Sequence, residues 1–156
     1  MDYVSIDACI NSFKWLLSNN IKFEYTSFGI DSLYNIEMLE LWKNSGLELK
    51  YTCKCIDNAS VYEHIDTLNW WINSGLELKY SEIAMDYCSY IETLDWWINS
   101  GLELKYSKKA LDRIIESKNM DEYMDVLNWW INSGLELKYS EKYFDVMSEI
   151  LSDHHK

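Results

Sequence analysis

The sequence contains no proline, only five glycines, no run of basic residues and no long apolar run. Clustered Lys and Arg supply most non-specific affinity for nucleic acid, so their absence and a net charge of −12 argue against nucleic-acid and anionic-membrane partners. No apolar stretch approaches the length of a membrane span, and Met1-Asp2-Tyr3 lacks the positive charge of a secretory signal. We expect a protein that stays in the compartment where it is made, with an acidic surface that suits a basic protein patch.

Signatures of catalysis and of metal binding are absent as well. The sequence has no glycine-rich phosphate loop, no Gly-x-Ser-x-Gly turn and no His-Glu-x-x-His helix. Its Cys-x-Cys pair has no second Cys or His pair at zinc-binding spacing, which favours reduced, buried thiols. We expect no enzymatic activity, no cofactor and no metal. The cysteines are Cys9, Cys53, Cys55 and Cys88.

What the sequence does contain is a recurring motif, Trp-Trp-Ile-Asn-Ser-Gly-Leu-Glu-Leu-Lys-Tyr-Ser. Successive glycines of this motif, from position 46 onward, are 29, 26 and 33 residues apart, yet the next Ser or Thr always follows six residues after the glycine. A period of roughly 20 to 50 residues is typical of solenoid arrays, which present extended surfaces to other macromolecules. The clearest copies lie at 70–81, 96–107 and 129–140, and weaker ones precede them.

The constant segment from the glycine to the Ser or Thr, called the joint below, has a physical interpretation. Gly takes the left-handed conformation that ends a helix, and the Ser or Thr supplies a side-chain oxygen that caps the next helix. Between them Leu-Glu-Leu-Lys-Tyr alternates apolar and polar residues, so it is expected to run extended with both leucines turned inward. Asn20 stands in the glycine position of the first copy. The sequence thus predicts helix, extended joint, helix.

The joints divide one repeat domain, residues 1–156, into units of two helices each, so the predicted fold is an all-α solenoid of helical hairpins with about ten helices. The tryptophans, mostly in the second helix of each unit, are expected in the core, and the alternative is an exposed Trp that acts as a binding anchor. Half-units at both ends suit capping repeats. In the last one Phe144, Met147, Ile150 and Leu151 form an apolar stripe that another partner would cover, which makes self-association through the terminal half-units possible. The units are 1–25 (N-terminal half-unit), 26–51, 52–80, 81–106 and 107–139 (full repeats) and 140–156 (C-terminal capping helix).

These motifs resemble ankyrin repeats. The similarity to that family lies in four features of each unit: Ser/Thr-x-x-small-apolar, a short turn, an apolar second helix and the closing Ser-Gly-Leu-Glu-Leu. Residues 58–68 match the hairpin of the family best. The Trp-Trp-Ile-Asn-Ser-Gly motif resembles the divergent ankyrin-like repeats of amoeba-infecting giant viruses, the mimivirus group, over roughly residues 5–152. The resemblance implies a non-catalytic protein–protein interaction module, a viral protein that engages a host or viral protein in the host cytoplasm or on the virion. The alternative is a structural or self-assembling component of a viral particle.

The chain departs from ordinary ankyrin repeats at its joints, which are shorter than the usual β-hairpin finger and contain no proline. Binding is therefore expected on helix faces and on the joints themselves. A Lys-Tyr pair recurs at each joint, and Tyr is enriched at interfaces because it combines large area with a hydrogen-bonding end. Recurrence in every unit also fits a packing role in which Tyr seals the joint. The partner-binding candidates are Lys50, Tyr51, Lys79, Tyr80, Lys105, Tyr106, Lys138 and Tyr139.

An aspartate also recurs, five residues after each capping Ser or Thr. Packed helices are about 8–10 Å apart, which is too far for two such carboxylates to share one ion or one proton. Two interpretations remain: a solvated or locally paired side chain in each first helix, and an acidic binding stripe. These positions are Asp31, Asp57, Asp86, Asp112 and Asp145.

Overall fold

The computed structural model describes residues 6–117 and 123–154. Within this part the protein is all-α, with ten α-helices, one short 3-10 helix and no strand, as the sequence predicts. The helices are α1 (Ile6–Ser18), α2 (Phe28–Asp31), α3 (Ile36–Asn44), α4 (Lys54–Val61), α5 (Ile65–Asn73), α6 (Ile83–Asp86), α7 (Ile91–Asn99), α8 (Lys109–Ile115), α9 (Met124–Asn132), η2 (Glu141–Tyr143) and α10 (Phe144–His154).

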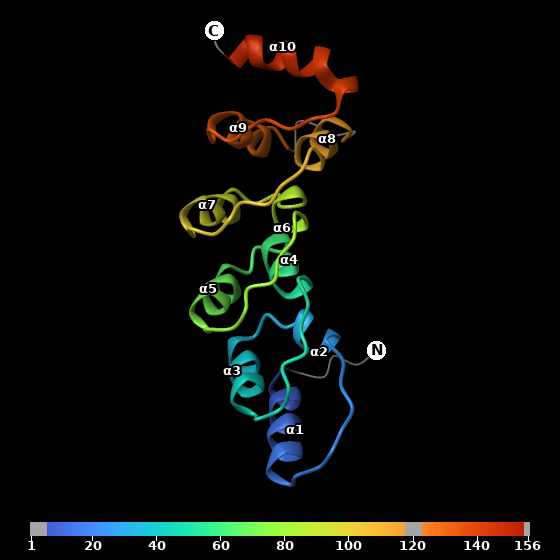
Figure 1. Ribbon diagram of the computed structural model, residues 1–156, viewed down its shortest axis with the longest axis vertical. Helices are drawn as coiled ribbons and strands as arrows, with labels where there is room; N and C mark the ends of the chain where they lie inside the picture. Colours follow the sequence, from blue (N-terminus) through green and yellow to red (C-terminus); the bar gives the residue numbers. More distant parts are fainter. Residues whose placement is uncertain (1–5, 118–122, 155–156) are drawn as a thin grey trace.

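The helices alternate between two columns along the long axis of the molecule (Figure 1). Helices α2, α4, α6 and α8 form one column, and α3, α5, α7 and α9 form the other. Neighbours within a column contact one another, as α4 does α6 and α7 does α9. Helix α1 packs against α3 at one end of the molecule, and α10 lies across the other end. Each pair, such as α4 and α5 within 52–80, falls inside one predicted unit.

The joints have the predicted backbone. Gly46, Gly75, Gly101 and Gly134 have φ values of 76°, 74°, 73° and 75°, and Asn20 has a φ of 52°. A Cβ at any of the four glycines would meet no atom within 4 Å, so the requirement for glycine is conformational and not steric crowding. After each glycine both leucines of the joint are half-buried and the Glu between them is exposed. The predictions that the glycine takes a left-handed conformation and that both leucines turn inward are confirmed.

The predicted capping needs one correction. The first helices begin one residue later than expected, so the N-cap positions are Cys53, Glu82 and Lys108, none of which makes a side-chain cap. The Ser or Thr before each of them still accepts a hydrogen bond, from the N–H two residues further on. These bonds join Lys54 N to Thr52 Oγ1, Ile83 N to Ser81 Oγ and Lys109 N to Ser107 Oγ, each at 3.2 Å.

Tryptophans fill the core from the second helices, but the two members of each pair differ. Trp71, Trp97 and Trp130 are each 1% exposed, whereas the Trp that precedes each of them is half-buried at the edge of its helix. The first helices contribute small residues such as Ala84 and Ala110, which let helices approach closely. The expectation that the tryptophans form the core therefore holds for the second member of each pair and partly for the first, and it is wrong for Trp15 of α1, which is 58% exposed.

The apolar residues of the C-terminal helix are more deeply buried than the sequence suggests. Met147 is fully buried, and Ile150 and Leu151 are half-buried against the core. Only Phe144 of the predicted stripe is exposed, at 61%. The expectation of an uncovered apolar stripe at this end is therefore wrong for Met147 and only partly right for the others. None of the helices within the described residues is long and apolar enough to cross a membrane.

Candidate functional site

The Lys-Tyr pairs form a ladder along the joints, in which each Lys reaches back to the Tyr of the preceding joint. Ammonium groups within about 6 Å of an aromatic centroid attract the ring electrostatically. Each Tyr ring that is followed by another joint has a Lys of this same chain over one face, so that face is not free to bind a partner. The Nζ-to-centroid distances are 4.7 Å for Lys50 over Tyr25, 4.6 Å for Lys79 over Tyr51, 4.4 Å for Lys105 over Tyr80 and 4.2 Å for Lys138 over Tyr106.

The tyrosines of this ladder are also fixed on their other sides. The Tyr80 ring lies 5.1 Å from the Trp97 ring, and its hydroxyl donates to the Glu103 carbonyl at 3.0 Å. Tyr51 repeats both contacts one unit earlier, and burial raises the pKa of both phenols. Tyr139, at the last joint, is half-buried against the core. These contacts favour the packing interpretation of the predicted Lys-Tyr candidates.

The recurring aspartates link each repeat to the next. Asp57 accepts hydrogen bonds from both the backbone N–H of Ser81, at 2.8 Å, and its hydroxyl, at 2.6 Å. Asp31, Asp57 and Asp86 are buried, so a solvent-facing acidic stripe is wrong for these three. Asp145, which has no later joint among the described residues, is exposed. The same two bonds join Asp31 to Thr52, Asp86 to Ser107 and Asp112 to Ser140.

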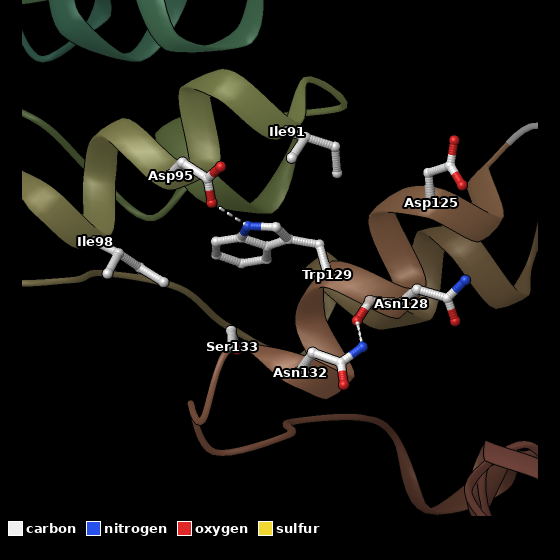
Figure 2. Close-up of a pocket in the computed structure, with 8 residues that line it drawn as sticks. All are labelled: Ile91, Asp95, Ile98, Asp125, Asn128, Trp129, Asn132 and Ser133. Carbon is white, nitrogen blue, oxygen red and sulfur yellow. Dashed lines mark hydrogen bonds between the residues drawn. The ribbon is translucent and has the colours of Figure 1, made fainter.

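The second-helix column carries a groove of about 610 Å³ between α7 and α9 (Figure 2). Each wall consists of residues at i, i+4 and i+7 of one helix, which share a face. The Trp129 side chain projects from α9 towards α7 and lies between Ile91 and Ile98 in this view (Figure 2). The wall residues are Ile91, Asp95 and Ile98 on α7 and Asp125, Trp129 and Asn132 on α9.

Trp129 is held in the groove by a hydrogen bond across the repeat boundary. Its indole N–H donates to Asp95 Oδ1 at 2.6 Å (Figure 2). The other carboxylate oxygen, Oδ2, makes no hydrogen bond or ion pair with the described residues. Asp95 and Asp125 are both exposed, and Ile98 is 40% exposed. The groove therefore combines an aromatic surface, apolar walls and two carboxylates, a combination that suits a cationic side chain with an aliphatic stem.

The cysteines are dispersed and do not contribute to this groove. Burial raises the pKa of the Cys55 thiol to about 12 and that of Cys88 to about 11, so both are protonated at neutral pH. Cys9 is exposed and Cys53 is half-buried. Among the described residues no three His, Cys, Asp or Glu side chains are grouped so as to hold a metal ion.

Sequence reasoning did not identify the groove, because it concentrated on positions that recur in every unit. The groove depends on positions that vary, such as 95 and 98, together with the Trp that follows in the next unit. Aligning the units on their glycines would have given the signal, since the acceptor of the indole lies six residues before the glycine in every case. Comparison with protein-family models, with curated proteins and with solved structures finds no match to the chain.

Proposed function

We propose that the chain is an ankyrin-like helical-repeat solenoid that acts as a non-catalytic protein-binding module. The alternating columns of helices and the constant joints support the solenoid part of this proposal. The resemblance of the Trp-Trp-Ile-Asn-Ser-Gly motif to repeats of amoeba-infecting giant viruses supports a viral origin and a host or viral protein as partner. Host cytoplasm or the virion is then the place of action.

The observation that carries the binding function is the α7–α9 groove, whose lining includes a half-buried aromatic ring and two exposed carboxylates. Trp and Tyr are enriched among the few residues that supply most of the binding energy of protein interfaces. By contrast, the Lys-Tyr ladder is engaged within the chain, and the buried aspartates are engaged across joints. A partner is therefore expected on the second-helix column, which keeps the helix faces of the sequence-based expectation and not the joints that it also named.

Site-specific photocrosslinking tests this proposal. Benzoylphenylalanine at position 98, on the groove wall, is expected to capture one protein from infected amoebae in a saturable manner. The same group at Glu77, which is exposed on the joint side of the molecule, is the matched control and should capture much less of it. Failure of position 98 to capture any protein saturably, or equal capture of the same protein from both positions, would contradict the proposal.

A further inference from the structure

The three boundaries between consecutive second helices share one arrangement, in which an indole N–H donates to a side chain of the helix before it. The acceptor differs in charge: it is a carboxylate at the first and third boundaries and a neutral amide at the second. The bonds run from Trp70 to Glu40 Oε1 at 2.5 Å, from Trp96 to Asn69 Oδ1 at 2.8 Å and from Trp129 to Asp95 Oδ1 at 2.6 Å.

The first boundary, between α3 and α5, supplies its own cation. Lys43 lies three residues after Glu40 on the same face of α3, and its Nζ is 5.9 Å from the centroid of the Trp70 ring. The chain thus places an ammonium over the indole whose N–H is bonded to a carboxylate. This is an internal example of how such a boundary accommodates a lysine.

The third boundary has the same carboxylate and ring but lacks the lysine. Ile98 stands where Lys43 stands in α3, three residues after Asp95. Among the described residues no Lys or Arg lies over the Trp129 ring or pairs with Asp95 or Asp125. The groove of Figure 2 lies at this boundary.

We propose that the α7–α9 groove binds a lysine side chain of a basic partner segment, with its ammonium over the Trp129 ring and beside Asp95 and Asp125. Its methylene stem would lie along Ile91 and Ile98, as long cationic side chains do on apolar surface. The net charge of −12 would attract such a segment at long range. The second boundary fits less well, because Asn69 gives it a neutral acceptor. This inference rests on the proposed function, since it names the chemistry of the partner for the same groove.

A titration of the protein with acetylated and amidated tetralysine tests the inference, with the Trp129 indole N–H followed by NMR. The same peptide acetylated on every Nε is the control, because it keeps the length and loses the charge. We expect a saturable shift of the Trp129 signal with tetralysine that weakens at high salt, and little shift with the acetylated peptide. An unmoved Trp129 signal would overturn the inference.

Three variants separate recognition in the groove from general attraction to an acidic protein. Asp95→Asn retains an acceptor for the indole, as Asn69 shows, and removes one charge, so affinity should fall roughly two- to fivefold. Ile98→Lys should place a tethered ammonium over Trp129 and abolish its response. Conversely, Lys43→Ile should open the first boundary and make the Trp70 indole respond. If Asp95→Asn and Ile98→Lys both bind tetralysine with the affinity and the Trp129 response of the wild type, the inference is overturned.

The two proposals fail in distinguishable ways. If position 98 captures a protein by photocrosslinking while tetralysine leaves Trp129 unmoved, the binding module stands and recognition of lysine is refuted. If tetralysine leaves the Trp129 signal unmoved and position 98 captures no protein, both proposals are refuted. Circular dichroism of each variant ensures that a lost response reflects the groove and not unfolding.

Discussion

Replacing the buried tryptophans offers a quantitative test of how the repeats are held together. Trp97 and Trp71 are each 1% exposed and stand at equivalent places in α7 and α5. They differ in one respect: the Trp97 indole N–H donates to Ser60 Oγ at 2.8 Å, whereas the buried Trp71 Nε1 has no hydrogen-bond partner among the described residues. Substituting each by Phe removes about the same volume, so the difference between the two costs isolates the hydrogen bond.

The expected magnitudes follow from this arrangement. Trp97→Ala should lower the free energy of unfolding by about 3–5 kcal/mol, a large fraction of a small domain's stability. Trp97→Phe should lower the free energy of unfolding by at least about 1 kcal/mol more than Trp71→Phe does. The change at 97 removes a hydrogen bond worth about 0.5–1.5 kcal/mol, whereas the change at 71 removes a buried donor that has no acceptor.

Urea unfolding followed by circular dichroism at the helical band measures these differences. Ser60 keeps its own bond to the Ala84 carbonyl in the Trp97→Phe variant, so no second polar group of this network is orphaned. Equal costs for Trp97→Phe and Trp71→Phe would refute the assigned role of the Ser60 bond. A loss below about 1 kcal/mol for Trp97→Ala would show that this ring is not part of the core.

Further predictions concern the joints, the thiols and the aspartates. Gly75→Ala should cost about 1–2 kcal/mol in thermal unfolding because of its positive φ, whereas Gly29→Ala, whose Cβ would lie 3.8 Å from Trp42, should be tolerated; equal effects would contradict the conformational argument. In the native protein at pH 8, iodoacetamide should modify Cys9 readily, whereas Cys55 and Cys88 should react only on unfolding, because burial raises their pKa to about 12 and about 11. Labelled Cys55 or Cys88 peptides from the native protein, detected by mass spectrometry, would contradict this prediction. Asp57→Ala should cost about 1–3 kcal/mol in urea because two donors of Ser81 lose their acceptor, while exposed Asp145→Ala should stay within about 0.5 kcal/mol, and the reverse order would refute the inter-repeat role.

The sequence predicted the helical content and the joints because both follow from local chemistry. Gly75 and Ser81 are separated by a constant distance, and the alternation of leucine with polar residues between them is readable without the fold. The start of the first helices was misplaced by one residue, because Ser81 also donates to Asp57, a bond that joins two repeats. No local sequence pattern predicts that bond.

The candidate site was harder to predict for a related reason. Asp57 and Ser81 are 24 residues apart while Asp112 and Ser140 are 28 apart, so the unequal hairpins hide which residues face each other. The same holds for Asp95 and Trp129, which come from different units. The recurring Lys-Tyr pairs are visible in the sequence, but packing between units produces the same recurrence.

Binding of the partner segment captured at position 98 provides the most direct test of the central claim, that this repeat protein binds another protein through the α7–α9 groove. Calorimetric titration of that segment into the wild-type protein and into Ile98→Lys compares an open groove with one filled from within. The account predicts clear binding by the wild type and at least a roughly tenfold loss for Ile98→Lys, a change of about 1.4 kcal/mol. Equal affinity for the two proteins would contradict it.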